Sequence, residues 1–394
     1  MIYLDWAATA PPDSAALEKH NETAQEYYGN PSSPHPLGLQ AEGLLNTCRE
    51  SIAACLGCNT NEVYFTSGGT ESNNIVLASV LGGKSRRRER RANLIISGIE
   101  HASVFAPACS LDGWDITVKT VKATAAGIVD PSLVERALDE DTRLVSVMHV
   151  NNETGAIQPV ADIAAVIRSF CRKTGRRIRF HTDGVQAFGK VPFSPRHLGV
   201  DAASLSAHKL GGLRGVGALY ISGDWPLEPL YRGGGQEGGV RPGTENLPGI
   251  AGFALVARNR VDLLDPAYRE ISGLMDKLTA ELSRLEGVKI IPADRIENRK
   301  ADYSPYILKI SVPPIPGEVL VRAMGERGIC VSTGSACSSR QRGANRVLEN
   351  MGVTRQDALS SIRISIGPST TENDLDRLLE TLKREVPPLL RISR

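Results

Sequence analysis

The order of short apolar runs and helical stretches is the feature that most constrains the fold of this chain. The runs are rich in β-branched residues and continuously apolar, which is typical of strands buried on both faces. Helical stretches such as 160–173 alternate with them, as in the crossovers of parallel sheets. The sequence therefore predicts an α/β fold with a mainly parallel sheet between helices. The runs lie at 93–97, 143–150, 177–181, 201–205 and 216–221.

The remainder of the chain has a different pattern. A glycine-rich region ends near residue 249, and a long helical segment is expected from about 250 to 286. Short strand-like runs then alternate with helices, which predicts a smaller α+β unit. Because 394 residues are too many for one ordinary core, we expect two domains. The expected division is a large domain at 15–257 and a small domain formed by 1–14 and 258–394.

The overall composition excludes several classes of protein. Apolar residues make up 41% and charged residues 23%, as in soluble globular proteins, and a formal charge of +2 argues against nucleic acid as the main partner. The basic run 86–91 is predicted to be a solvated loop. No apolar stretch is long enough to span a membrane, so a cytoplasmic location is expected. The seven cysteines form no disulfide framework, and the pair Cys55 and Cys58 lacks a second pair for a zinc site.

The apolar run 201–205 is followed by Ser206, Ala207, His208 and Lys209. A lysine at the end of a strand-like run lies at the carboxyl edge of a sheet, where open α/β folds bind ligands. An amine fixed there suits a Schiff-base lysine. Asp183, just past the run 177–181, could keep a pyridine nitrogen protonated. Taken alone, the lysine is more often a surface residue and the aspartate a turn former.

A candidate anion site lies at 66–73, which follows a strand-like run and opens a helical one. Its two glycines expose backbone N–H groups, its hydroxyls add donors, and a helix N-terminus favours an anion. The pattern is neither a Walker loop nor a GxGxxG fingerprint. Elsewhere, Asn152 and Gln186 could donate to a ring hydroxyl, and His101 could stack on an aromatic ring.

Two further residues are chemically notable. Cys337 is surrounded by glycine, alanine and serine at 334–339, the polar and flexible context that a reactive thiolate requires. Arg363 interrupts an apolar strand-like run, and a buried arginine needs an anion. That anion is either an internal carboxylate or the carboxylate of a substrate.

Taken together, the motifs resemble those of the NifS/IscS-type cysteine desulfurases of the class-V aminotransferase family. The resemblance extends in order over nearly the whole chain. The matching motifs are DWAAT at 5–9, GNPSS at 29–33, GTESNN at 69–74, EH at 100–101, NNETG at 151–155, HTD at 181–183, SAHK at 206–209, GGGQE at 233–237, RPGT at 241–244 and GSAC at 334–337. One departure is the stretch 213–214, Leu-Arg, where the family often has Pro-Lys.

The resemblance implies a fold-type I enzyme that uses pyridoxal 5′-phosphate, with a seven-stranded sheet in its large domain and a smaller C-terminal domain that carries the loop of Cys337. It also implies a homodimer that converts L-cysteine to L-alanine. The sulfur would pass to Cys337 as a persulfide and then to an acceptor protein, for iron–sulfur cluster assembly or tRNA thiolation. No resident metal is expected, although Cys337 could transiently ligate an iron–sulfur cluster.

The resemblance also implies roles for individual residues. Lys209 would bind the cofactor covalently, His101 would stack on its ring, and Cys337 would be the nucleophile. Arg363 and Asn152 would bind the substrate. The implied cofactor-binding residues are Gly69, Thr70, Asn152, Asp183, Gln186, Ser206, His208, Lys209 and, from the other subunit, Thr244.

Three alternatives stay open on the sequence. A selenocysteine lyase or an aminotransferase of the same fold would share most of these motifs, and an aminotransferase has no need of Cys337. A non-catalytic sulfur-relay protein with the same fold would have no need of Lys209 and Asp183, and both are present.

Overall fold

The structure is a computed structural model of the whole chain. It describes residues 1–79, 92–112, 116–223, 225, 227, 229–297, 300–334 and 345–393. The basic run 86–91 and Cys337, both singled out in the sequence, lie outside the described residues.

The central element is a seven-stranded sheet with the strand order β2-β8-β7-β6-β5-β3-β4. Strand β8 is antiparallel to both of its neighbours, and the other pairs are parallel. The predicted mainly parallel sheet is therefore confirmed. Its strands are β2 (Val63–Thr66), β3 (Ala92–Ser97), β4 (Ile116–Val121), β5 (Thr142–Ser146), β6 (Arg179–Asp183), β7 (Ala202–Ser206) and β8 (Gly217–Ile221).

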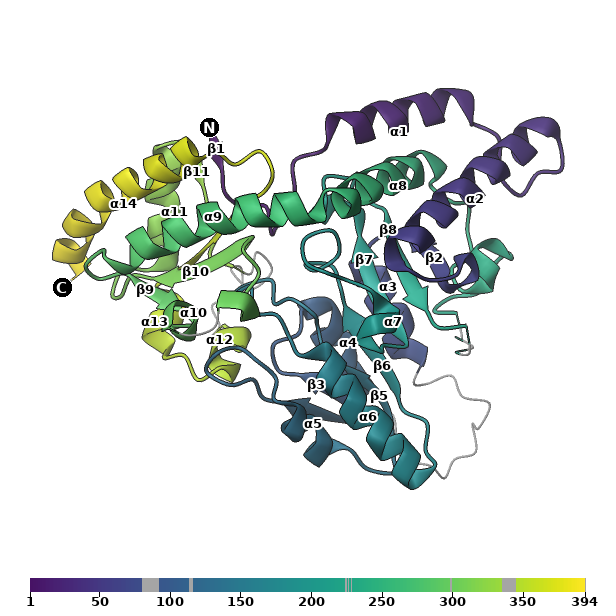
Figure 1. Cartoon of the computed structure of the whole chain (residues 1–394), viewed down its shortest axis with the longest axis horizontal. Helices are drawn as coiled ribbons and strands as arrows, with labels where there is room; N and C mark the ends of the chain where they lie inside the picture. Colours follow the sequence, from purple (N-terminus) through teal and green to yellow (C-terminus); the bar gives the residue numbers. More distant parts are fainter. Residues whose placement is uncertain are drawn as a thin grey trace.

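Helices cover both faces of this sheet (Figure 1). Apolar residues of α2 (Pro36–Leu56), α6 (Val160–Thr174) and α8 (Leu247–Asp262) pack with Ile95 of β3 on one face. Residues of α3 (Gly69–Ala78) and α4 (Ala102–Leu111) pack with Leu94 and Ile96 on the other. Successive residues of a strand point to opposite faces, so a strand buried on both sides has no polar alternation. The remaining helices of this part are α1 (Ser14–Glu26), α5 (Pro131–Ala137) and α7 (Pro195–Leu198).

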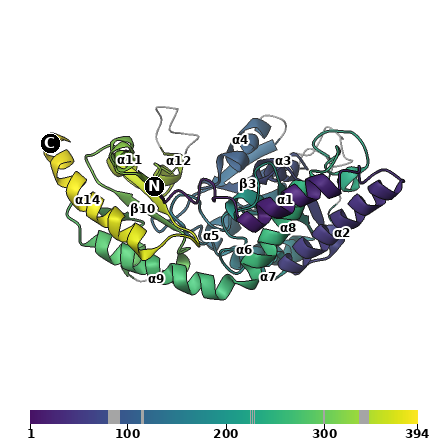
Figure 2. The same cartoon turned by 90° about the horizontal axis from the view of Figure 1, so that it is seen from above.

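The second part is built on an antiparallel sheet of order β12-β10-β9, with its own apolar core. The chain begins in this part, because β1 (Ile2–Tyr3) pairs with β11 (Ile329–Cys330). Figure 2 shows α14 running beside α9 along one edge of the molecule. The elements are β9 (Lys289–Ile291), β10 (Ile307–Ser311), β12 (Ser361–Ser365), α9 (Leu264–Ser283), α10 (Asp294–Glu297), α11 (Gly317–Glu326), α12 (Arg346–Asn350), α13 (Arg355–Leu359) and α14 (Glu372–Ser393).

The connection between the two sheets differs from the expectation. One helix was expected over 250–286, and the structure has two, α8 and α9, separated at Leu263. Leu263 has φ −102° and ψ 14°, and it is largely exposed, so no packing of this side chain favours a continuous helix. The expected division at residue 257 falls inside α8, and it stays a prediction.

Candidate active site

The site lies where parallel strands end. Strand β6 ends at Asp183 and its neighbour β7 ends at Ser206, and a short 3-10 helix (Ala207–Lys209) follows directly. Gly69 begins α3 beside the same edge, and a Cβ added there would lie 2.6 Å from Cγ2 of Val185. Only glycine therefore lets α3 approach the turn after Asp183 this closely.

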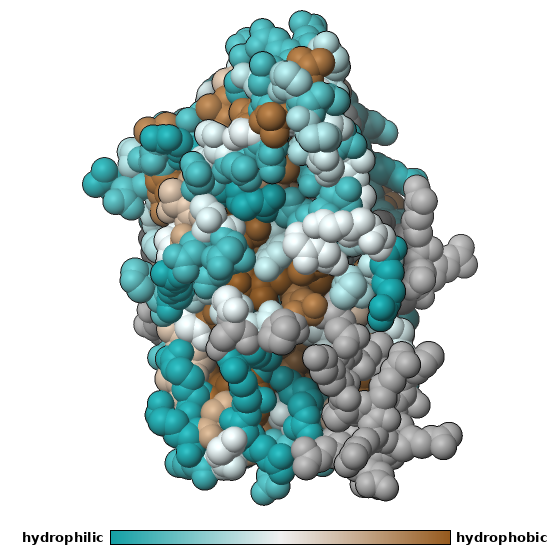
Figure 3. All heavy atoms as spheres, turned by 90° about the vertical axis from the view of Figure 1, so that its right-hand side faces the viewer, coloured by the Kyte–Doolittle hydropathy of each residue, from teal (hydrophilic) through white to brown (hydrophobic). Residues whose placement is uncertain are grey.

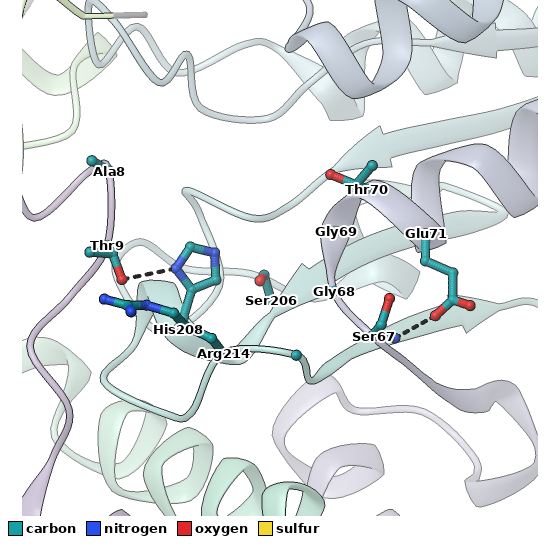
Figure 4. A pocket seen from close by; sticks show the side chains of 11 residues that line it. Ala8, Thr9, Ser67, Gly68, Gly69, Thr70, Glu71, Ser206, His208 and Arg214 are labelled. Carbon is teal, nitrogen blue, oxygen red and sulfur yellow. Dashed lines mark hydrogen bonds between the residues drawn. The ribbon is translucent and has the colours of Figure 1, made fainter. Parts of the chain in front are cut away.

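A cavity of about 420 Å³ lies at this edge (Figure 4). Its lining offers the N-terminus of the ten-residue helix α3, hydroxyl groups and the guanidinium of Arg214. Helix N-termini and exposed backbone N–H groups favour anions, and the cation strengthens that preference. The lining residues are Ala8, Thr9, Ser67, Gly68, Gly69, Thr70, Glu71, Ser206, His208, Arg214 and Gly215.

The carboxylate of Glu71 also lines this cavity, but its negative charge does not prevent an anion from binding there. It accepts hydrogen bonds from the backbone N–H of Ser67 and from the hydroxyl of Tyr231, and Arg241 lies 3.4 Å away. Burial alone would raise the pKa of Glu71, but these donors lower it overall. The charge of Glu71 is therefore largely neutralised by its own partners.

His208 and Arg214 both line the cavity (Figure 4). Burial, with the charges of Lys209, Lys190 and Arg214, lowers the pKa of His208 to about 4. The ring is therefore neutral at pH 7, with its Nδ1 3.1 Å from Oγ1 of Thr9. Arg214 was noted in the sequence only as a departure from the family pattern. In the structure, its guanidinium lines the cavity.

Asp183 is held rigidly. It is buried, Asn73 Nδ2 donates to its Oδ2 at 2.9 Å, and the Val185 backbone N–H donates to its Oδ1 at 3.0 Å. The same Asn73 Nδ2 lies 2.8 Å from Oγ of Ser103. Oδ1 of Asn73 is buried and has no hydrogen-bond partner among the described residues. Asn73 was not among the predicted site residues, although it lies within the GTESNN motif.

His101 is linked to Asp183 through Ser103 and Asn73. The Ser103 backbone N–H donates to His101 Nδ1 at 3.2 Å, and Ser103 Oγ lies 2.7 Å from the same atom. Because Nδ1 accepts, the ring proton is on Nε2. Burial lowers the pKa of His101, although the charge of Asp183 acts in the opposite direction. The imidazole is therefore neutral at neutral pH, with a fixed tautomer and orientation.

Lys209 is held against the N-terminal segment. Its Nζ donates to the backbone carbonyls of Ala7 at 2.7 Å and Ala8 at 2.6 Å. Gln186 Nε2 donates to the same Ala7 carbonyl at 2.8 Å, and Lys190 Nζ donates to Gln186 Oε1 at 2.9 Å. Burial lowers the pKa of Lys190 to about 7, and the charge of Lys209 adds to this effect. Two lysines thus lie within one hydrogen-bond chain.

Arg363 lies on β12 and reaches toward the same region. Its Nη2 donates to Asp5 Oδ1 at 2.8 Å, and its Nη1 donates to the carbonyls of Asn152 at 2.8 Å and Gly334 at 2.9 Å. Its Nε is buried and has no partner among the described residues. An internal carboxylate, that of Asp5, therefore pairs with this arginine, which answers one half of the question left open by the sequence.

The structure brings most of the candidate residues together, with two exceptions. Thr244 is exposed and is not among the residues lining the cavity. Cys337 cannot be placed, because it lies outside the described residues. In the part of the chain that is described, no cluster of three or more His, Cys, Asp or Glu side chains has metal-binding geometry. Burial raises the pKa of Cys55 to about 11 and that of Cys58 to about 12, so neither is a thiolate at neutral pH.

A family model described as "Aminotransferase class-V" matches residues 2–378. The chain belongs to this family. Pyridoxal 5′-phosphate is the cofactor of class-V enzymes. The site fits this group: the α3 N-terminus and its hydroxyls suit a phosphate, and the buried Asp183 suits a pyridinium.

Relatives and solved structures narrow the assignment within the class-V family. A NifS/IcsS protein homolog of Lactobacillus delbrueckii subsp. bulgaricus is 39% identical over 384 residues, 96% of this chain and 95% of the relative. The cysteine desulfurase IscS of Dictyoglomus turgidum is 35% identical, over 100% of this chain and 96% of its own length. A solved NifS-like protein is 36% identical, covers 99% of both chains, and has a TM-score of 0.88. A structure described as SspA in complex with cysteine is 29% identical, covers 94% of this chain and 100% of its own, and has a TM-score of 0.79.

One prediction concerns His181, two residues before Asp183 on β6. The ring is fully buried between Ser146 Oγ at 2.8 Å and Ser204 Oγ at 3.0 Å, and burial lowers its pKa to about 3. The unfolded chain binds a proton near pH 6.5 that the folded state excludes, so stability is lost as the pH falls below 6.5. The expected loss from this group is about 2 to 3 kcal/mol between pH 7 and pH 4.5.

Urea unfolding at the two pH values measures this loss. The variant His181→Gln keeps a donor and an acceptor for the two serines but has no proton to bind. We expect its free energy of unfolding to fall by about 2 kcal/mol less than that of the wild type over the same pH range. Equal losses in both proteins would show that His181 is not the acid-sensitive group.

Proposed function

We propose that this protein is a cysteine desulfurase that depends on pyridoxal 5′-phosphate. The observation that carries the proposal is one arrangement at the sheet edge. Lys209, Asp183 and His101 converge beside an anion-binding cavity, and Arg363 keeps a buried donor without a partner. The names of the relatives and the solved complex with cysteine support the same substrate.

The cofactor, when bound, supplies an electron sink for the bond-breaking steps. Its phosphate would be held by the α3 N-terminus with Gly69 and Thr70, and by Ser206 and His208. Asp183 would hold a proton on the ring nitrogen, because Asn73 and the Val185 N–H fix its carboxylate in one orientation. Asn152 and Gln186 would contact the ring oxygen.

The remaining residues act on the substrate. Lys209 Nζ would bind the cofactor covalently in the resting enzyme and take the proton from the substrate Cα once it is released. Its contacts with the Ala7 and Ala8 carbonyls keep the amine at this edge. His101 would stack on the cofactor ring as a neutral imidazole, with its Nε2–H group available to donate a hydrogen bond. Arg363 and Asn152 would bind the substrate carboxylate, with the free Nε of Arg363 as the first donor.

The sulfur transfer balances without a further reactant. Cys337 as a thiolate attacks the sulfur of the substrate: an S–S bond forms, and the Cβ–S bond breaks. The carbon side keeps the electron pair, takes up a proton and leaves as alanine. The net reaction is L-cysteine plus the Cys337 thiol giving L-alanine plus the Cys337 persulfide. An acceptor protein would then receive the outer sulfur.

The homodimer also belongs to this proposal. Figure 3 shows the side of the molecule that holds α1 and α2, where apolar side chains gather in a hollow surrounded by polar ones. Large apolar residues are exposed in this chain, among them Tyr28, Leu39 and Tyr231. Contiguous apolar surface of this kind is typical of subunit interfaces. Thr244, exposed in the single chain, would reach the phosphate of the second subunit.

The unpaired cysteines support a cytoplasmic location. The cysteines at 48, 55, 58, 109, 171 and 330 are all unpaired, as expected in a reducing compartment. Among the described helices, none combines the length and the apolar character needed to cross a bilayer.

The test is a single incubation of the yellow holoenzyme with L-cysteine. We expect one equivalent of L-alanine and a mass increase of one sulfur atom on the peptide that contains Cys337. A 2-oxo acid requirement for turnover would favour an aminotransferase instead. Turnover of L-selenocysteine with none of L-cysteine would favour a selenocysteine lyase.

A further inference from the structure

A fully buried ion pair lies beneath the candidate site. Lys309 projects from the middle of β10, its side chain has no exposed surface, and its Nζ lies 3.0 Å from Oε2 of Glu153. The side chain of Glu153 is 4% exposed. Removing two charges from water is unfavourable, so such a pair is weak evidence for stability and better evidence for a specific arrangement.

The pair holds both ends of one chain segment. Lys309 Nζ also donates to the backbone carbonyl of Thr333 at 3.0 Å. Asn345 Nδ2 donates to the same Glu153 Oε2 at 2.7 Å. Thr333 and Asn345 lie on either side of residues 335–344, which contain Cys337. A single carboxylate oxygen therefore connects the two flanks of that segment.

Gly334 shows how closely the first flank approaches the pair. A Cβ added at this residue would lie 2.4 Å from Lys309 Nζ and 3.0 Å from Glu153 Oε2, and its φ is +111°. The backbone conformation favours glycine, and a side chain here would displace Lys309 Nζ from its position. The carbonyl of Gly334 accepts a hydrogen bond from Arg363 Nη1 at 2.9 Å. The flank is thus fixed directly against the arginine that we assign to the substrate carboxylate.

The charged forms of Lys309 and Glu153 favour each other inside the protein. Burial alone would raise the pKa of Glu153, but Lys309, Asn345 and Arg363 lower it overall. Burial lowers the pKa of Lys309, and the carboxylate of Glu153 opposes that effect. Each group is therefore stabilised by partners that also belong to the flanks or to the substrate site.

We propose that Lys309 and Glu153 are positioning residues for persulfide formation, because they fix both flanks of segment 335–344 beside Arg363. The proposal rests on the proposed function in one respect, that Cys337 accepts the sulfur. Cys337 follows Gly334 by three residues, so chain length alone keeps the two Cα atoms within about 11 Å. The hydrogen bond between Gly334 and Arg363 therefore fixes the described end of this segment at the arginine that we assign to the substrate carboxylate.

The test separates positioning from general support of the fold. Lys309→Met removes the cation of the buried ion pair. Asn345→Ser removes the amide that donates from the second flank to Glu153. Serine is a good helix N-cap, so it preserves the cap that Asn345 supplies to α12. The control is Lys289→Met, which removes an exposed lysine of the neighbouring strand β9. Asn345→Ser keeps the buried ion pair, so it remains informative if Lys309→Met folds poorly.

Three rates are measured on the holoenzymes. The first is persulfide formation on the Cys337 peptide in a single turnover with L-cysteine. The second is exchange of the Cα hydrogen of L-alanine in heavy water, which uses the cofactor site and Lys209 but no thiol. The third is trypsin cleavage after Arg340 or Arg342, identified by mass, which needs no substrate.

We expect Lys309→Met to lower the persulfide rate by about 10-fold or more and Asn345→Ser by about 3-fold, with Cα exchange within 2-fold of the wild type. Tryptic cleavage within 335–344 should be faster in both variants and unchanged in Lys289→Met. A parallel loss of both reactions, or unchanged persulfide and cleavage rates, would overturn the positioning role. A wild-type protein that exchanges the alanine hydrogen but forms no persulfide would instead overturn the proposed function, and this inference with it.

Discussion

Replacing Lys209 by alanine is expected to reduce alanine formation from L-cysteine by about 10³-fold or more. The amine has two roles, since it binds the cofactor and moves the Cα proton, and no other described side chain is placed to take over both. Lys190 is connected to Lys209 through Gln186 and the Ala7 carbonyl, but its side chain is buried and its Nζ donates to Gln186. The variant should still bind the cofactor through the phosphate cavity, but without a covalent bond.

Visible absorption after reconstitution and a coupled alanine assay measure these two effects. The matched control is Lys277→Ala, an exposed lysine of α9, which should behave as the wild type. Alanine formation within 10-fold of the wild type in Lys209→Ala would show that this lysine is not the base. Loss of noncovalent cofactor binding as well would assign Lys209 a wider role in building the pocket.

The second large effect is expected for Cys337→Ala. This variant should keep the absorbance of the bound cofactor and the hydrogen exchange of L-alanine, because the sheet-edge residues are unchanged. It should lose persulfide formation and sulfide release by about 10²-fold or more, because none of the cysteines in the described part of the chain lines the cavity at the sheet edge. Cys109→Ala, which removes an exposed thiol on α4, should have no effect.

The assay is sulfide release from L-cysteine in the presence of a thiol reductant. Undiminished sulfide from Cys337→Ala would reject its role as the nucleophile. A loss of cofactor absorbance together with sulfide would place Cys337 in the structure of the site rather than in the transfer step.

The sequence predicted the sheet because its central strands are buried on both faces. Strand β3 reads as a continuous apolar run for this reason, with Leu94 and Ile96 facing one layer of helices and Ile95 the other. Strand β4 was not predicted. It is at the edge of the sheet, and Thr117, Lys119 and Thr120 interrupt its apolar character. A run of this kind is hard to separate from a loop by periodicity alone.

The sequence also predicted the residues that follow strands directly, because local order places them at the sheet edge. Lys209 and Asp183 are of this kind, and both lie there in the structure. The partners that orient them were not predictable in the same way. Asn73 and Asp183 are 110 residues apart, and Arg363 and Asp5 are 358 apart. Such contacts are fixed by tertiary packing, and no spacing in the sequence encodes them.

Identifying the lysine that carries the cofactor tests the proposed function most directly. The holoenzyme is reduced with borohydride and digested, and the peptide labelled with the pyridoxyl group is sequenced by mass spectrometry. We expect a label on Lys209. A label on the neighbouring Lys190, or no label on any lysine, would contradict it.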